Sequence, residues 1–140
     1  MQGPPGGGKT SLARKLHACS IGSASAETEI CSTDDFHYNQ NGIYQFDPSR
    51  IGEFHERNLQ RTKQLLDAEH SVIVDNTNIH AWEAKPYVEH AVKKGIPVIF
   101  IRVDGNFKSI HGFPQDKIDK MRSEMENLTV ESCLKAVRPF

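Results

Sequence analysis

The stretch Gly3-Pro4-Pro5-Gly6-Gly7-Gly8-Lys9-Thr10, near the start of the 140-residue chain, decides the fold. It fits the pattern of glycine, four residues of any type, glycine, lysine, and then serine or threonine, which is typical of a phosphate-binding loop. Glycines allow left-handed dihedrals, so successive backbone N–H groups can turn inward around phosphate oxygens. A helix that begins near Lys9 would add unpaired N–H groups and the positive end of its dipole. The stretch therefore predicts a nucleotide-binding loop.

The pattern also gives side chains their roles. Lys9 is expected to reach the β- and γ-phosphates, and the Thr10 hydroxyl is expected to hold Mg²⁺. The alternative is a surface turn, rich in glycine and proline, in front of an ordinary helix. The helical pattern that follows favours the phosphate loop. The nucleotide-binding residues expected from this stretch are Gly3, Gly6, Gly7, Gly8, Lys9, Thr10 and Ser11.

Strands and helices alternate along the rest of the chain. Apolar spacing and turn residues predict helices at 10–18, 47–68, 81–94 and 117–128, and strands at 29–32, 72–74 and 97–103. The segment 97–103 is the clearest strand, because it is apolar almost throughout. The alternation predicts an α/β domain of the P-loop NTPase type, a three-layer α/β/α arrangement around a parallel sheet. The domain is expected to span residues 1–128, and the tail 129–140 to hold at most a short strand.

The start of the chain is unusual for this architecture. A phosphate-binding loop normally follows a buried strand. Here only Met1 and Gln2 precede Gly3, which is too short for a strand. The sequence therefore predicts that the first strand is missing from this chain.

Composition narrows the class of protein. The 17 basic and 18 acidic side chains give a net charge of −1, which argues against bulk electrostatic binding to nucleic acid. The three cysteines form no Cys-x-x-Cys pair, so neither a disulfide framework nor a structural zinc site is expected, and a reducing compartment, cytoplasmic or nuclear, fits. No signal peptide and no apolar run long enough for a membrane span are found.

Two acidic positions follow predicted strands. Asp34, after the 29–32 strand, is a candidate to orient or deprotonate an attacking hydroxyl. Asp75, after the apolar 72–74 strand, is a candidate second ligand for Mg²⁺. At each position the alternative is an aspartate that caps a turn or a helix. Both alternatives stay open at this point.

Three further residues are candidates near the phosphates. Thr77 and Asn78 can hydrogen-bond there, or can simply cap the next helix. Lys108 lies in the irregular segment 104–114, where a cation on a mobile cover could neutralise the transferred phosphoryl group. A GTPase is disfavoured, because the sequence has no Asn-Lys-x-Asp motif and no Asp-x-x-Gly follows the 72–74 strand.

Four motifs together resemble the Nedd-four-binding-protein-two-like family. They are Ile30-Cys31-Ser32-Thr33-Asp34-Asp35-Phe36, Asp75-Asn76-Thr77-Asn78, Ala81-Trp82-Glu83-Ala84-Lys85-Pro86-Tyr87 and Ile110-His111-Gly112. That family is a branch of P-loop proteins similar to the kinase domain of polynucleotide kinase. The resemblance covers nearly the whole chain and implies an ATP-binding kinase fold.

The resemblance also implies an activity and site residues. In the polynucleotide kinase relatives, the ATP γ-phosphate is transferred to a 5′-hydroxyl. On that analogy Lys9 and Thr10 match the phosphate and magnesium residues, Asp34 matches the general base, and Thr77 and Asn78 match a motif near the phosphates and substrate. The expected ligands are ATP and Mg²⁺, and the expected acceptor is a nucleotide or a nucleic-acid 5′-hydroxyl. No association with a membrane is expected. The competing reading is a catalytically inactive nucleotide-binding or protein-interaction module with a protein partner.

Overall fold

Two parallel strands form the regular sheet of the computed structural model, which describes residues 1–20, 27–109 and 111–139. Strand β1 (Thr28–Cys31) pairs with β2 (Ser71–Val74) in a register that matches Thr28 with Ser71 and Cys31 with Val74. The carboxyl ends of parallel neighbours lie at the same edge of a sheet. The chain segments that carry Asp34 and Asp75 therefore leave the sheet side by side.

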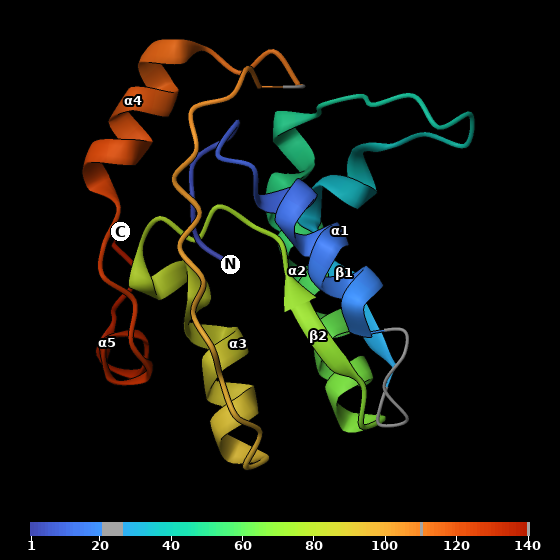
Figure 1. The fold of residues 1–140 in the computed structure, drawn as a ribbon, viewed down its shortest axis with the longest axis vertical. Helices are drawn as coiled ribbons and strands as arrows, with labels where there is room; N and C mark the ends of the chain where they lie inside the picture. The colour runs from blue at the N-terminus through green and yellow to red at the C-terminus, as the bar shows by residue number, and fades with distance from the viewer. Residues whose placement is uncertain (21–26, 110, 140) are drawn as a thin grey trace.

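Helices flank this sheet. Helix α1 (Lys9–Ser20) contacts β1, and α2 (Ile51–Asp67) contacts both strands. In Figure 1, α1 lies in front of the strands and α2 behind them. Asp47 caps the short 3₁₀ turn η2 (Pro48–Arg50) that leads into α2, since its side chain accepts a hydrogen bond from the Ser49 N–H. The predicted helices in these regions are confirmed to within a few residues.

Helix α3 (Ala81–Lys93) follows β2 and ends where the sequence indicates. Gly95 has a φ of 69°, a conformation that glycine adopts more readily than other residues after a helix. The side chain of Trp82, in the first turn, faces the end of the chain: the Arg138 guanidinium lies 5.2 Å from the centre of its ring. No helix in the described ranges is long and apolar enough to cross a membrane.

The strand predicted at 97–103 is not formed. The segment is extended, but its ladder consists of one isolated parallel bridge between Gln2 and Arg102. The Gln2 N–H donates to the Ile101 carbonyl at 2.9 Å, and the Val103 N–H donates to the Gln2 carbonyl at 2.7 Å. The prediction of a regular strand is wrong because apolar composition alone does not make a strand. A paired neighbour is required, and of the residues that the structure describes only Gln2 pairs with this segment.

The first two residues lie between β2 and the 97–103 segment. The Met1 amino group donates to the Val74 carbonyl at 2.8 Å, on one side of Met1-Gln2. Gln2 pairs with Ile101 and Val103 on the other side. In Figure 1 the amino terminus lies between the arrow of β2 and the extended orange trace of this segment. These two residues therefore bridge the two parts of the sheet at its carboxyl edge.

The C-terminal region differs from expectation in two ways. Helix α4 (Gln115–Glu124) is shorter than the predicted 117–128 helix, because Met125 leaves helical geometry with a ψ of 113°. The tail forms helix α5 (Val130–Lys135) rather than a short strand, and Thr129 and Ser132 cap its start reciprocally. Cys133, with no exposed surface, packs into a core cluster with residues of α3 and with Leu128.

Candidate functional site

The phosphate-loop motif folds back on itself beside the end of β2. The Gly3 N–H donates to the Thr77 carbonyl at 2.9 Å, and the Gly7 N–H donates to the Pro4 carbonyl at 3.0 Å. Gly6 and Gly8 have φ angles of 75° and 93°, which only glycine adopts without strain. The Gly7 N–H is thus used within the loop, and the N–H groups of Gly6, Gly8 and Lys9 form no backbone hydrogen bond with the described residues.

A second segment lies directly against the outer side of this loop. The Gly105 N–H donates to the Gly7 carbonyl at 3.0 Å, and the Phe107 N–H donates to the Gly6 carbonyl at 2.9 Å. In a trans peptide the N–H points opposite to the carbonyl, so the Gly8 N–H points away from Gly105. A Cβ on Gly6 would lie 2.3 Å from the Phe107 carbonyl oxygen, so this close approach requires glycine. The contact leaves the inner side of the loop for a ligand.

Thr10 and Asp75 meet at the base of the loop. Helix α1 places Thr10, and β2 delivers Asp75, so that the Thr10 hydroxyl donates to Asp75 Oδ2 at 2.7 Å. Asp75 is only 5% exposed, and its Oδ1 atom is buried with no hydrogen-bond partner among the described residues. A carboxylate oxygen buried without a partner is costly. Hydroxyl and carboxylate oxygens are the donors that Mg²⁺ prefers, so this pair fits a magnesium ion.

Lys9 lies between the loop and the two acidic positions. Its ammonium group donates to the Pro4 carbonyl at 2.9 Å. Burial lowers the pKa of Lys9, and the negative charges of Asp75 and Asp34 act in the opposite direction. The arrangement places one half-buried cation within the electrostatic influence of both carboxylates, where phosphate groups would meet it.

Asp34 begins the turn after β1. It lies in the 3₁₀ turn η1 (Thr33–His37), and its N–H donates to Ser32 Oγ at 3.3 Å. The Thr33 N–H donates to Asn76 Oδ1 at 3.0 Å, which ties this turn to the end of β2. The Asp34 side chain is 56% exposed, and its Oδ2 lies 3.8 Å from His111 Nε2. The Asp34 carboxylate is therefore open to solvent at the carboxyl edge of the sheet.

Thr77 and Asn78 hold the start of the loop in place. The Thr77 carbonyl accepts from Gly3, and Asn78 Nδ2 donates to the Met1 carbonyl at 2.8 Å. Asn78 has a φ of 43°, in the left-handed region that asparagine tolerates better than most residues. In the structure, Thr77 and Asn78 therefore bond to Gly3 and Met1, at the start of the loop. Their contact with phosphates stays a prediction.

Lys108 and Ser11 lie at the surface, outside the group formed by Lys9, Thr10, Asp75 and Asp34. Lys108 is exposed and forms no ion pair with the described residues, although its neighbour Phe107 contacts Gly6 and Gly8. Ser11 is also exposed and lines a shallow hollow beside the loop together with Gly8, Lys15 and Phe107. The structure brings Lys9, Thr10, Asp75 and Asp34 together, and leaves Lys108 on the rim.

Residues 1–106 match the family described as AAA domain. The chain belongs to this AAA domain family. It is also similar to NEDD4-binding protein 2 of Homo sapiens, with 40% identity over 131 residues. That match covers 86% of this chain and 7% of the relative's length, so the chain spans a small part of that protein.

A solved structure shows the same fold. The APS kinase of Mycobacterium tuberculosis superposes with a TM-score of 0.58 and 16% identity, over 90% of this chain and 94% of that one. The α/β P-loop kinase fold predicted from the sequence is therefore confirmed, with a regular sheet that is only partial among the described residues. The resemblance to the NEDD4-binding protein 2 relatives is confirmed as well. A P-loop domain of this family implies nucleotide binding.

Two residues that shape the site of this AAA domain, Tyr44 and Asn58, were not identified from the sequence. The rings of Tyr44 and His111 stack, with centroids 3.9 Å apart and planes at 16°. Burial and the nearby charge of Asp34 raise the pKa of Tyr44 to about 12. Tyr44 lies in the loop 36–46, whose sequence indicates only turns. No local pattern could have paired it with His111.

A buried polar network supports the turn that carries Asp34. Asn58, which has no exposed surface, donates to the Tyr87 hydroxyl at 3.2 Å, and Asn76 donates to the same hydroxyl at 3.4 Å. Arg61 joins the network through Asn58 and pairs with Asp35 at 2.9 Å. The position of Asn76 in the sequence pointed to the site, because Asn76 directly follows Asp75. Asn58 and Tyr87 lie on helices, where their polar character alone indicates exposure.

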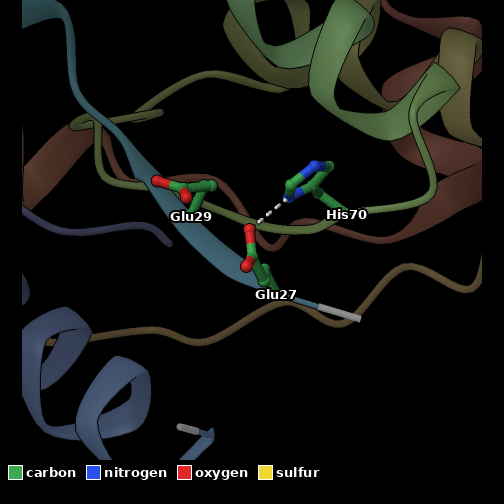
Figure 2. Close-up of side chains that lie close together, drawn as sticks. All are labelled: Glu27, Glu29 and His70. Atoms are coloured by element: carbon green, nitrogen blue, oxygen red, sulfur yellow. Dashed lines mark ion pairs between the residues drawn. The ribbon is translucent and has the colours of Figure 1, made fainter. Parts of the chain in front are cut away.

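A separate group of possible metal ligands lies at the other end of the strands. One ligand atom each of Glu27, Glu29 and His70 fall within 4.8 Å of one another. Figure 2 shows Glu27 reaching toward His70, with 3.9 Å between Glu27 Oε2 and His70 Nδ1. The Glu27 side chain is 83% exposed, so water competes for its carboxylate. The group is a surface ion pair with a neighbouring acid, remote from the nucleotide loop.

Proposed function

We propose that this AAA domain binds ATP with Mg²⁺ and transfers the γ-phosphate to a hydroxyl group of a nucleotide or polynucleotide. The observation that carries the proposal is the contact of Thr10 with Asp75, whose Oδ1 atom is buried without a partner among the described residues, near the half-buried Lys9. A hydroxyl, a carboxylate and an ammonium group at the mouth of a phosphate loop are the groups that phosphoryl transfer requires.

Each residue has a distinct task in this proposal. The N–H groups of Gly8 and Lys9 bind phosphate oxygens, and the Lys9 ammonium group exchanges the Pro4 carbonyl for the β- and γ-phosphates. Thr10 and Asp75 hold Mg²⁺. The ion, when bound, neutralises negative charge on the phosphates. Thr77 and Asn78 keep the loop aligned through Gly3 and Met1.

Asp34 serves the acceptor in this proposal. Its carboxylate, 56% exposed at the carboxyl edge of the sheet, accepts the proton of the attacking hydroxyl or orients it. Lys108 on the rim supplies a cation to the transferred group when its segment closes. Lysine acts there as a point charge, without the planar two-point contact of arginine.

Calorimetry with ATP and Mg²⁺ tests the binding half of the proposal. Lys9→Ala should abolish measurable binding, whereas Lys135→Ala, which removes an exposed lysine of α5, should change it little. Unchanged affinity in Lys9→Ala would remove the loop from the proposal.

Transfer of labelled phosphate from ATP tests the catalytic half. Oligonucleotides and nucleosides with a free 5′-hydroxyl serve as acceptors, and Lys9→Ala provides the background. Asp34→Asn should bind ATP normally and transfer no phosphate above that background. Full activity of Asp34→Asn would exclude Asp34 as the base.

One observation favours a second function, a nucleotide-binding module without transfer. The one cation proposed for the cover, Lys108, forms no ion pair with Asp34 or any other described acid. This function predicts ATP binding that Lys9→Ala abolishes, together with no transfer to any of the acceptors above.

A further inference from the structure

One arginine of α4 holds the segment that lies against the phosphate loop. The Arg122 guanidinium donates to the Gly105 carbonyl at 3.1 Å and to the Asp104 carbonyl at 3.4 Å, and it also bonds to the Asp104 carboxylate. A planar guanidinium can serve several acceptors in a fixed geometry, which an ammonium group cannot do. Arg122 therefore fixes the backbone at residues 104–105 relative to α4.

Helix α4 is itself anchored on the side that carries Arg122. Ile118 is only 3% exposed, and it lies one turn before Arg122, so the two side chains share one face of the helix. The Arg122 side chain is 29% exposed, which agrees with a position at the edge of this buried face. The support for segment 104–105 is therefore a packed helix face.

The held segment sets the direction of peptide groups in the phosphate loop. The Gly105 N–H donates to the Gly7 carbonyl at 3.0 Å, and the Phe107 N–H donates to the Gly6 carbonyl at 2.9 Å. In a trans peptide the carbonyl and the following N–H point in opposite directions. The bond from Gly105 therefore turns the Gly8 N–H toward the inner side of the loop, where the proposed function places phosphate oxygens.

The glycines of the loop need a restraint from outside the loop. Glycine has more accessible backbone conformations than other residues, so Gly6, Gly7 and Gly8 have little intrinsic preference for one arrangement. The neighbouring segment approaches closely, because a Cβ on Gly105 would lie 2.6 Å from the Gly7 carbonyl oxygen. A loop that is already ordered binds its ligand without the entropic cost of ordering. A firm hold on Gly105 should thus raise the affinity for phosphate.

We propose that Arg122 is a positioning residue for the phosphate loop, which holds Gly105 against Gly7 and so keeps the Gly8 N–H directed at a phosphate that ATP and ADP share. This inference rests on the proposed nucleotide binding. Arg102 provides a matched control. It lies 3.8 Å from Asp104 Oδ2, but it is 50% exposed, and its described side-chain contacts include no bond to Gly105.

Amide hydrogen exchange measured by NMR tests the hold without any nucleotide. In Arg122→Ala, the N–H groups of Gly105 and Phe107 should exchange about tenfold faster than in the parent chain, since a hydrogen bond from a charged group is worth about this factor. The amides of β1 should exchange at the parent rate, which excludes general destabilisation. Arg102→Ala should leave the exchange of Gly105 and Phe107 nearly unchanged.

Calorimetry with ATP and with ADP tests the consequence for the loop. Arg122→Ala should weaken the binding of both nucleotides by the same factor, on the order of tenfold, because both carry the phosphate that the Gly8 N–H contacts. Guanidinium ion at millimolar concentration should restore part of the lost affinity, because it can occupy the place of the missing side chain. It should change nothing in Arg102→Ala.

Three outcomes would overturn the inference. They are unchanged exchange of Gly105 and Phe107 in Arg122→Ala, equal effects of Arg102→Ala and Arg122→Ala, and a loss of ATP affinity without a loss of ADP affinity. The last outcome would mean that Arg122 contacts the terminal phosphate directly. Absence of nucleotide binding to the parent chain would instead refute the proposed function, and the exchange rates would still show whether Arg122 holds the segment.

Discussion

His111 Nε2 lies 3.8 Å from Asp34 Oδ2. The His111 ring also stacks on Tyr44, with 3.9 Å between the ring centroids. Two loops that are far apart in the sequence are thereby joined over the candidate base. The side chain proposed to accept the proton has a defined neighbourhood, although it remains open to solvent.

The titration of Tyr44 should show that its hydroxyl lies near Asp34. Its pKa is raised to about 12, first by burial and then by the charge of Asp34. Asp34→Asn should lower the Tyr44 pKa but leave it above the ordinary value of about 10, because burial remains. Tyrosinate absorbance measures this as the difference between each chain and the same chain carrying Tyr44→Phe, which leaves Tyr38 and Tyr87 in place. An identical titration with and without Asp34 would contradict the arrangement.

Gly6→Ala should be more damaging than its positive φ alone explains. Gly6 and Gly42 have φ angles of 75° and 73°, so an alanine costs about 1–2 kcal/mol of conformational strain at either site. Only at Gly6 would the Cβ meet a backbone atom, the Phe107 carbonyl oxygen at 2.3 Å, whereas the space around Gly42 is open. Urea unfolding should show the larger loss for Gly6→Ala. Equal losses would mean that the loop and the 105–107 segment separate easily.

Thr10→Val should show what the Thr10 hydroxyl contributes, because valine has nearly the same shape as threonine but no hydroxyl. The variant leaves the buried Asp75 carboxylate without its hydrogen bond, so the free energy of unfolding should fall by about 1–3 kcal/mol. Asp75→Asn should keep a partner for Thr10. Calorimetry in the presence and absence of Mg²⁺ should show that both variants lose the magnesium-dependent part of ATP affinity. A normal magnesium dependence would place the ion elsewhere.

Asn76→Ala should disturb the turn that carries Asp34, although Asn76 does not belong to that turn. It removes the acceptor of the Thr33 N–H, a buried contact of 3.0 Å, and should cost about 1–3 kcal/mol of stability. Asn39→Ala, which removes an exposed loop contact, is the matched control. Phosphate transfer should fall in Asn76→Ala while ATP affinity holds. Loss of ATP affinity instead would show that Asn76 acts on the phosphate loop.

The part of the site that follows strand ends was predictable. An apolar run followed by an acid places Asp75, and the phosphate-loop spacing places Lys9 and Thr10, because local sequence determines both. The contact between Thr10 and Asp75 follows once the strands are parallel. Asp34 was identified by the same reasoning.

What depends on distant partners was not predictable. The 97–103 segment has the composition of a strand but, within the described ranges, has no paired neighbour along most of its length, and composition does not record neighbours. Likewise, Tyr44 becomes part of the site only through His111, and Cys133 enters the core only because α5 docks on α3. Thr129 and Ser132, which cap α5, were a local signal for this helix. The signal was overlooked because the helical pattern after it is short.

The pairing of Gln2 with Ile101 and Val103 has a consequence for folding order. During synthesis the phosphate loop leaves the ribosome well before the segment around Ile101 and Val103 that pairs with the residue in front of the loop. Contacts with such large sequence separation form late, since loop closure must come first. A nucleotide would therefore bind only after this long-range pairing has formed, so that nucleotide binding would report the pairing during folding.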